Sequence, residues 1–182
     1  MKYIKTTIIT ILLIYLIIPS NILADSFISI DNNDIMIAKG SKEKITVSLN
    51  NAAGRFDIDA TDKNIAIIDK DKIFLDKSSE EIEIEGMNNG KTKINICATD
   101  VNTYDYQELN DLVYTINITV YTKGDIDNNG NVDLGDVTTL LKKYLGTEEA
   151  TKEDIVIFDM NNNGKIELND LVELLKIYLG IN

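Results

Sequence analysis

A twelve-residue pattern of oxygen-bearing side chains occurs twice in the last third of the 182-residue chain, and it restricts the fold more than any other feature. The first copy begins at Asp125 and the second at Asp159, 34 residues later. Each copy has Asp, Asn or Glu at positions 1, 3, 5, 9 and 12, and a glycine at position 6, which is Gly130 or Gly164. Because glycine adopts positive φ without a steric penalty, each copy is predicted to form a tight loop that wraps its oxygens around one centre.

The alternating oxygens match the requirements of a hard divalent cation. Ca²⁺ takes roughly six to eight oxygen ligands at ~2.3–2.6 Å, and a turn with donors at alternate positions supplies them. Position 7 contributes its backbone carbonyl, so the residue type there is free to vary. Two loops in register predict two Ca²⁺ ions as cofactors, whereas the alternative is a pair of Asx-rich turns without metal. The predicted ligands are Asp125, Asp127, Asn129, Asn131, Asp133 and Asp136 in the first loop, and Asp159, Asn161, Asn163, Lys165, Glu167 and Asp170 in the second.

Each loop is followed by apolar residues at helical spacing. The spacing predicts helices over residues 134–145 and 168–179, each with one apolar face that closes a small core between the helices. Position 8 of each loop is also apolar, and these residues, Val132 and Ile166, are expected to pair the loops through a short β-bridge. The predicted core face consists of Val137, Leu140, Tyr144, Leu171, Leu174 and Tyr178.

The order of elements distinguishes this repeat from an EF-hand. Position 12 is Asp instead of the bidentate Glu, and no helix-length segment precedes the first loop. The duplicated loop-then-helix unit over residues 124–182 resembles the dockerin family, the calcium-dependent modules that attach secreted proteins to cohesin domains. The resemblance rests on Gly124-Asp125-Ile126-Asp127, Asn129-Gly130, Asp136-Val137 and 140–145 in the first copy, and on Asp159-Met160-Asn161, Asn163-Gly164, Asp170-Leu171 and 174–179 in the second. It implies a cohesin-domain protein as the partner, in a cellulosome-like assembly connected with polysaccharide catabolism.

A second apolar stripe runs beside the predicted core face, through Leu134, Thr138, Leu141 and Leu145 and through Leu168, Val172, Leu175 and Leu179. A segment this small has too little interior for both stripes, so the second stripe favours a protein partner; ordinary packing between the helices is the alternative. In the dockerin family, loop positions 10 and 11 and the following helix contact the cohesin. Many cellulosomal dockerins have Ser or Thr at those positions and this chain does not, which leaves the cohesin class open. The implied partner-binding residues are Leu134, Gly135, Leu141, Lys142, Leu145, Leu168, Asn169, Leu175, Lys176 and Leu179.

Residues 25–123 alternate between apolar and polar side chains with a period of two. The alternation predicts seven to nine short strands, with candidates at residues 26–30, 34–38, 44–49, 55–60, 65–68, 73–75, 81–85, 92–98 and 113–121. So many short strands in about a hundred residues predict an antiparallel sandwich. The unpatterned stretch over residues 100–111 is expected to be one long loop.

The same region resembles the bacterial immunoglobulin-like modules of secreted and surface proteins. This resemblance rests on Asp62-Lys63-Asn64-Ile65-Ala66-Ile67-Ile68, on Gly86 and Gly90 ahead of residues 92–96, and on residues 114–120. The predicted fold class is therefore an all-β immunoglobulin-like sandwich, residues 25–123, followed by a small all-α dockerin-like domain with two calcium loops, residues 124–182. Immunoglobulin-like modules of this kind serve as spacers or adhesive units, and carbohydrate is a candidate ligand of the sandwich.

Two features of the sandwich region invite a chemical interpretation. Asp57, Asp59 and Asp62 could form a second metal site or a catalytic carboxylate group. The first two alternate with apolar residues, however, so the cluster is expected to lie on a solvated strand face. Cys97 has no second cysteine to pair with, and its apolar neighbours predict that it is a buried filler of the core.

Residues 1–24 have the layout of a secretory signal peptide. Lys2 and Lys5 precede an apolar run over residues 8–18, and Ala24 offers a small residue at the cleavage point. The run is short for a membrane span, although an uncleaved N-terminal anchor is the alternative. The protein is therefore expected to be secreted, extracellular or held at the cell surface through a cohesin, and to have no membrane attachment of its own after cleavage.

The composition excludes several classes of function. The chain has 18 basic and 30 acidic side chains, a net charge of −12, which disfavours nucleic acid and anionic membranes as partners. It has no histidine and one cysteine, which excludes Ser-His-Asp and Cys-His nucleophiles and zinc sites rich in His or Cys. We therefore expect a non-enzymatic adaptor that binds a cohesin through helices organised by calcium. The alternatives are a calcium-stabilised adhesin and a glycosidase that uses two carboxylates.

Overall fold

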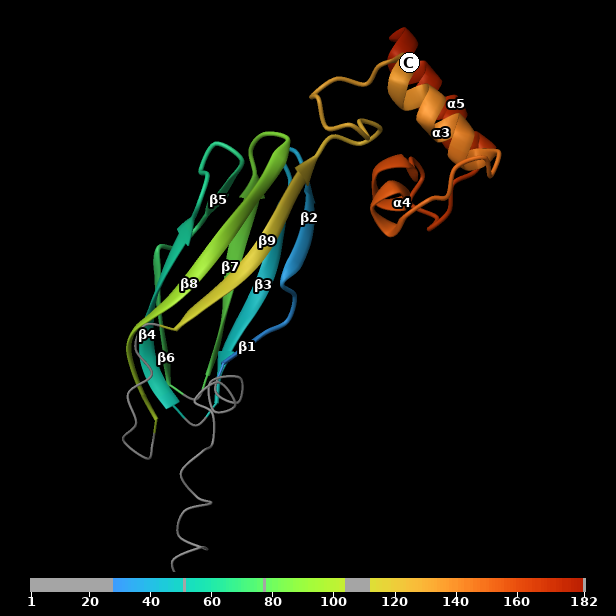
Figure 1. Ribbon diagram of the computed structural model, residues 1–182. Helices are drawn as coiled ribbons and strands as arrows, with labels where there is room; N and C mark the ends of the chain where they lie inside the picture. The colour runs from blue at the N-terminus through green and yellow to red at the C-terminus, as the bar shows by residue number, and fades with distance from the viewer. Residues whose placement is uncertain (1–27, 51, 77, 104–111, 182) are drawn as a thin grey trace, which may run out of the picture.

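The computed structural model describes residues 28–50, 52–76, 78–103 and 112–181. Within these ranges the chain forms a β-sandwich, and helices follow beyond the end of the sandwich at which the last strand finishes (Figure 1). The predicted signal peptide, residues 1–24, lies outside the described residues. The strands are β1 (Ile28–Ile30), β2 (Asp34–Ala38), β3 (Lys42–Leu49), β4 (Ala52–Ala60), β5 (Ala66–Ile68), β6 (Lys72–Asp76), β7 (Ser79–Gly86), β8 (Gly90–Thr103) and β9 (Val113–Tyr121), and the helices are α3 (Leu134–Tyr144), α4 (Lys152–Phe158) and α5 (Leu168–Leu179).

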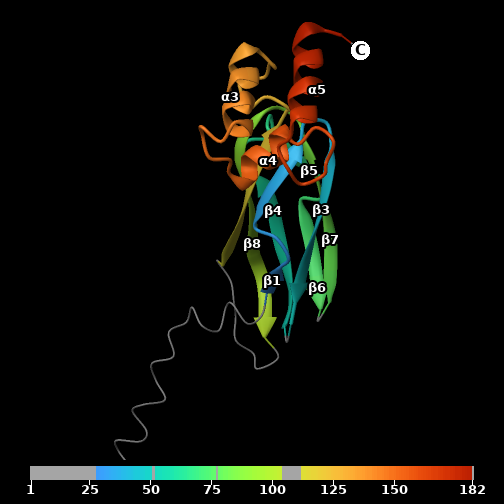
Figure 2. The same cartoon turned by 90° about the vertical axis from the view of Figure 1, so that its right-hand side faces the viewer.

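Two sheets pack face to face in the sandwich (Figure 2). The first has the strand order β1-β3-β7-β5 and the second has the order β2-β9-β8-β4-β6. Paired strands are antiparallel except β2 and β9, which run parallel from Asp34 opposite Asn117 to Ala38 opposite Tyr121. The prediction of an antiparallel sandwich is therefore wrong at this edge, because side-chain alternation shows that a segment is a strand but not in which direction it pairs.

Alternating side chains along the strands build the core of the sandwich. In β4, Phe56 and Ile58 are buried while Arg55 and Asp59 point outward. The other long strands alternate in the same way, as expected of strands with one face on a core and one in water. Buried apolar residues from both sheets form one continuous cluster, so the sandwich has its own hydrophobic core.

The predicted loop over residues 100–111 is wrong in its first part. β8 continues to Thr103 and stays paired with β4, as far as Ala52 opposite Thr103. The register shifts between Arg55 and Phe56, which pair with Asp100 and Ala98. Thr99 of β8 is left unpaired in this bulge, and it interrupts the alternation that would have marked the strand. Residues 104–111, the rest of the predicted loop, lie outside the described residues.

Cys97 is half-buried, so the prediction that it fills the core is wrong. Ile96 and Ala98, its neighbours in β8, are buried. Because successive side chains in a strand point to opposite faces, apolar neighbours place Cys97 on the other face of the sheet. Among the described residues it is a free thiol.

The predicted fold class, an all-β immunoglobulin-like sandwich followed by an all-α dockerin-like domain, is wrong. The described chain is mostly β-sandwich, and its helices are short, with 11 residues in α3, 7 in α4 and 12 in α5. The rest of residues 124–181 is turn and loop. The physical reason is that a carboxylate accepts backbone N–H groups within each loop, as at Gly130 and Gly164, so the two loops stay in a turn conformation and add no helix.

The helices themselves lie close to the predicted ranges. α3 ends at Tyr144, one residue before the predicted end, and α5 matches residues 168–179. α4 was not predicted, although Thr151 and Asp154 form a capping box at its start, which is a recognisable signal for the beginning of a helix. None of the helices in the described ranges is long and apolar enough to cross a membrane.

A second, smaller apolar cluster lies among the helices. Tyr144 and Tyr178 do not belong to the buried part of it, since they are 40% and 41% exposed. The described residues show no β-bridge between the loops; instead Val132 and Ile166 pack partly buried against this cluster. Met36 of β2 and Tyr121 of β9 pack against it from the sandwich side. The buried members are Val137, Leu140, Ile157, Phe158, Leu171 and Leu174.

Candidate metal centres

Asp125 lies at the centre of the first loop and is fully buried. Its Oδ1 accepts the backbone N–H of Asn129 at 3.1 Å, and its Oδ2 accepts that of Gly130 at 2.8 Å. Asn128 and Gly130 have φ values of 58° and 94°, the left-handed conformation that a tight turn requires. The turn folds positions 1 to 6 around the Asp125 carboxylate, as the sequence pattern predicts.

Asp136, at position 12, joins the loop to the first turn of α3. Its Oδ1 accepts the N–H of Ile126 at 2.8 Å, and its Oδ2 accepts the N–H of Asp133 at 2.8 Å. Carboxylate oxygens of Asp125, Asp127 and Asp136 lie within 4.8 Å of one another. Three carboxylates so close together repel one another unless a cation lies between them.

The second loop repeats this hydrogen-bonding scheme position by position. Asp159 Oδ1 accepts the N–H of Asn163 at 3.0 Å, and its Oδ2 accepts the N–H of Gly164 at 2.6 Å. Asp170 Oδ1 accepts the N–H of Met160 at 2.9 Å, and its Oδ2 accepts the N–H of Glu167 at 2.7 Å. The two loops therefore have the same folded shape, 34 residues apart in the sequence.

The remaining predicted ligands lie on the outer parts of the same two loops. Position 3 accepts the N–H of position 5 in both, at 3.1 Å from Asp127 and 3.0 Å from Asn161. Glu167 Oε2 accepts a hydrogen bond from the Asn163 amide at 3.0 Å. All twelve predicted ligands thus lie on the two loops, and those with exposed side chains are Asp127, Asn129, Asn131, Asp133, Asn161, Asn163 and Lys165.

The two position-1 carboxylates have pKa values shifted in opposite directions. Burial raises the pKa of Asp125, and nearby carboxylates of the same loop add to this effect. Burial also opposes ionisation of Asp159, but backbone N–H groups of its loop and the positive charge of Lys123 outweigh it and lower its pKa. The surroundings of the loops therefore differ even though their geometry is the same.

The donor chemistry of both loops fits calcium. Every predicted ligand offers an oxygen, either from a side chain or from the backbone carbonyl of position 7. Hard oxygen donors suit Ca²⁺ rather than zinc or copper, which favour nitrogen and sulfur. The close carboxylates of the first loop and the repeated turn geometry of the second are the observations that agree with this fit.

Most of the predicted partner-binding residues lie on the surface of the helices. Leu134 and Leu168, at loop position 10, are 58% and 53% exposed. Leu175 differs, because it is half-buried and packs against the helical cluster. Contact of this set with a partner remains a prediction. The members with exposed side chains or backbone are Leu134, Gly135, Leu141, Lys142, Leu145, Leu168, Asn169, Lys176 and Leu179.

Sequence reasoning missed a buried ion pair between α3 and α4. Lys143 Nζ lies 2.8 Å from Asp154 Oδ2, and both side chains are almost completely buried. Glu148 Oε1 lies 3.2 Å from the same nitrogen. The capping box at Thr151 was the available signal for α4, but no sequence pattern indicated which lysine would face it.

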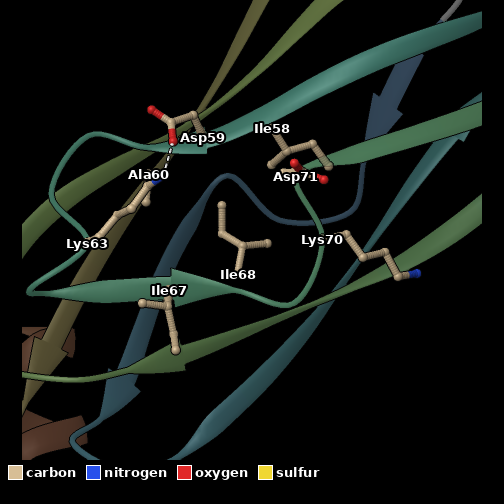
Figure 3. Close-up of a pocket in the computed structure, with 8 residues that line it drawn as sticks. All are labelled: Ile58, Asp59, Ala60, Lys63, Ile67, Ile68, Lys70 and Asp71. Carbon is tan, nitrogen blue, oxygen red and sulfur yellow. Dashed lines mark ion pairs between the residues drawn. The ribbon is translucent and has the colours of Figure 1, made fainter.

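The acidic cluster of the sandwich lies beside a shallow pocket, shown in Figure 3. Asp59 Oδ1 pairs with Lys63 Nζ at 2.8 Å, and Asp62 Oδ1 accepts the N–H of Asn64 at 2.9 Å. Asp57 is 3.9 Å from Lys72 Nζ. These local contacts agree with a solvated strand face. The pocket measures about 180 Å³, and its lining residues include no aromatic ring on which a sugar could stack.

The duplicated loops and their helices match a known protein family. Residues 123–179 match the dockerin type I domain. A dockerin domain implies calcium binding, in agreement with the acidic cluster of the first loop. The match does not extend into the sandwich, and the resemblance of the sandwich to bacterial immunoglobulin-like modules is not confirmed by a family match. No curated protein matches the sequence.

Several solved structures resemble about half of the chain. Domains 4 and 5 of the S-layer protein SbsC are 18% identical, with 51% of this chain and 50% of that chain covered and a TM-score of 0.40. WR4, an MSP family member of C. elegans, is 11% identical, with 53% and 97% covered and a TM-score of 0.40. A chaperone-tip adhesin complex of CFA/I fimbriae is 12% identical, with 53% and 56% covered and a TM-score of 0.42. This chain thus spans half or less of the SbsC structures, and we infer no function from these similarities.

Proposed function

We propose that this protein is a secreted, non-catalytic adaptor whose dockerin domain binds two Ca²⁺ ions and docks onto a cohesin domain of a scaffold or cell-surface protein. One observation supports this most strongly. Within the segment that matches the dockerin type I domain, Asp125 and Asp159 organise two loops of the same geometry. In this proposal each loop holds one ion.

The position-12 aspartates couple the loops to the helices. Asp136 is in the first turn of α3, and Asp170 is in the first turn of α5. Each accepts one N–H from the start of its loop and one from the residue before its helix. Bound calcium would neutralise the carboxylates, so the helices would keep the orientation that the loops impose.

The cohesin would contact the exposed apolar stripe along α3 and α5. Its outer leucines come in equivalent pairs, Leu134 with Leu168 and Leu145 with Leu179, and all four are more than half exposed. Exposed leucines at equivalent positions of the two sequence repeats are expected for a surface that binds a protein. In this proposal the sandwich acts as a spacer.

Pull-down of the full-length mature protein with a panel of purified cohesin domains tests this function. Binding is expected to at least one cohesin in millimolar calcium and to be lost when a chelator is added. The double variant Asp125→Ala/Asp159→Ala should not bind under either condition. Asp59→Ala, which removes an exposed carboxylate from the sandwich, is the matched control and should bind as the wild type does.

The outcomes separate the alternatives. Binding to polysaccharide but to no cohesin would replace the adaptor with a carbohydrate-binding adhesin. Hydrolysis of polysaccharide by the purified protein would contradict the non-catalytic assignment. Calorimetry that shows one ion, or none, would contradict the assignment of two calcium sites.

A further inference from the structure

One side chain of the sandwich reaches a predicted calcium ligand. Asn89 lies in the turn between β7 and β8, and its Nδ2 donates to Asp125 Oδ2 at 2.8 Å. The other end of the same amide is also engaged, because Asn89 Oδ1 accepts the hydroxyl of Thr122 at 2.9 Å. Both contacts are partly buried, so the amide is held in one orientation.

The turn that presents Asn89 is fixed by the sheet. Gly90, the next residue, pairs with Val120 near the end of β9. Gly90 has a φ of 146°, and a Cβ there would lie 2.9 Å from Ile65 Cδ1, so the turn is closely packed. Asn128 of the first loop also donates to the carbonyl of Val120, at 3.4 Å. The end of the sandwich thus contacts the first loop at two points.

The second loop has no equivalent support within the described residues. Asp159 accepts only backbone N–H groups of its own loop. Lys123 is the residue nearest to the sandwich that reaches this loop, and its Nζ contacts Asn162 Oδ1 and the carbonyl of Val156, each at 3.0 Å. Neither is a predicted ligand. The contact from the sandwich to a position-1 carboxylate is therefore specific to the first loop.

We infer that Asn89 is a positioning residue for the first calcium loop, supplied by the sandwich. This inference rests on the proposed function, because it requires two calcium sites. Residues that hydrogen-bond to a metal ligand fix its orientation, and their loss typically lowers metal affinity about 10–100-fold. The hydrogen bond from Asn89 is made to a carboxylate, which strengthens it, and Thr122 holds the donor in place before any ion arrives.

A consequence is that calcium and the domain junction are coupled. If the contact with Asn89 strengthens calcium binding, then calcium in the first loop must strengthen the contact to the same extent. The sandwich and the dockerin domain would then form a more rigid unit in calcium than in its absence. Calcium would bind to the second loop without strengthening any contact with the sandwich.

Calcium titration of full-length variants by calorimetry tests the inference. Asp159→Ala leaves the first loop as the only site, and Asp125→Ala leaves only the second. Adding Asn89→Ala should lower the affinity about tenfold in the Asp159→Ala protein and leave the Asp125→Ala protein unchanged. Thr122→Val, which keeps the shape but removes the hydroxyl that orients Asn89, should give a smaller loss in the first loop alone.

Asn88→Ala is the matched control, because Asn88 is in the same turn but its amide donates to the carbonyl of Asn64 within the sandwich. It should leave the calcium affinity of both single-site proteins unchanged. An equal loss in both single-site proteins, or no loss in either, would overturn the role of Asn89. If the Asp159→Ala protein binds no calcium before Asn89 is changed, the proposed function fails instead, so the two failures are distinguishable. Circular dichroism must show the same strand signal in every variant. If Asn89→Ala loses this signal, Thr122→Val takes its place in the comparison.

Discussion

The two loop-and-helix copies share one geometry but have different surroundings. In both, a position-1 aspartate accepts N–H groups from positions 5 and 6. Asp125 also accepts a hydrogen bond from the sandwich, whereas Asp159 lies near the positive charge of Lys123. Burial raises the pKa of Asp125, and the neighbouring carboxylates of its loop add to this effect. Burial also acts on Asp159, but backbone N–H groups of its loop and the charge of Lys123 outweigh burial and lower its pKa. The comparison shows that a sequence repeat determines the loop, while its neighbours determine how the loop behaves.

The helices that follow the loops differ in a similar way. Lys143 of α3 is buried in its pair with Asp154, whereas the equivalent residue of α5 is Ile177, which is 50% exposed. Both helices are followed by a glycine of positive φ, Gly146 at 70° and Gly180 at 64°, so their ends do not differ in this respect. α4 therefore restrains α3, and α5 presents the larger apolar surface.

Removal of calcium should unfold both loop-and-helix copies. Residues 124–182 contain twelve acidic and five basic side chains, a net charge of −7, and the core among the helices is small. Calcium at a hundred times its Kd stabilises a site by about 2.7 kcal/mol, which is a large share of the stability of so small a unit. A chelator should therefore remove most of the helical circular dichroism while the strand signal remains. Equal helix content with and without calcium would contradict this prediction.

Removal of one position-1 carboxylate should abolish calcium binding in one copy and leave it in the other. Asp125→Ala and Asp159→Ala each delete a predicted ligand and the acceptor of two backbone N–H groups. Each variant should bind one calcium ion instead of two by calorimetry. The same stoichiometry in a variant and in the wild type would show that the altered loop still holds its ion.

Neutralisation of the buried acid that pairs with α3 should cost more stability than neutralisation of an exposed acid on α5. Asp154→Asn keeps the shape of the side chain but leaves Lys143 without its closest partner, and it should lower the free energy of unfolding by about 2 kcal/mol. That is below the ~3–5 kcal/mol of a fully buried pair, because Glu148 remains near Lys143. Glu173→Gln, which breaks the exposed pair with Lys176 on α5, is the control and should cost less than about 1 kcal/mol.

The same pair predicts a dependence on pH. Burial opposes ionisation of Asp154, but its hydrogen bonds with Lys143 and Thr151 outweigh burial and lower its pKa. A lowered pKa means that the stabilisation is present above the pKa of Asp in the unfolded chain, about 3.9, and is lost as the pH falls through the lower folded value. The melting temperatures of the wild type and Asp154→Asn should therefore converge in acid. A constant difference at all pH values would show that the charge of Asp154 is not the cause.

The smallest expected effect concerns the choice between the helices in cohesin binding. If either helix can dock, Leu134→Asp/Leu145→Asp and Leu168→Asp/Leu179→Asp each remove one of two binding modes. Loss of one of two equal modes weakens binding about twofold, and the α5 pair should weaken it more because Ile177 adds apolar surface there. The quadruple variant should not bind, and calcium stoichiometry must stay unchanged in all three. Complete loss from one pair alone would show a single binding mode.

Much of the sandwich could be predicted from period-two alternation. The bounds of β2 and β9 agree with the predicted strands, since both alternate cleanly between buried and exposed residues. The parallel pairing of β2 with β9 could not be predicted, because alternation carries no information about direction. The extension of β8 was missed because the unpaired Thr99 at the bulge breaks the period of β8.

In the candidate site, the sequence predicted the local conformation of the loops better than it predicted contacts between distant segments. The hydrogen bonds within each loop join residues at most ten positions apart, such as Ile126 and Asp136. Spacing within the loop is therefore enough to predict them. The pair of Lys143 with Asp154 was missed because it depends on where α4 packs.

The sequence by itself determined the two loops and the start of the helix that follows each one, and it predicts the ligands within each loop. It could do so because a glycine at position 6 and oxygens at alternate positions dictate one local conformation. Only the tertiary structure decided that Asn89, 36 residues before Asp125, supports the first loop and not the second. That contact depends on how the β7–β8 turn lies against the chain after β9, and burial of apolar surface throughout the sandwich sets that arrangement.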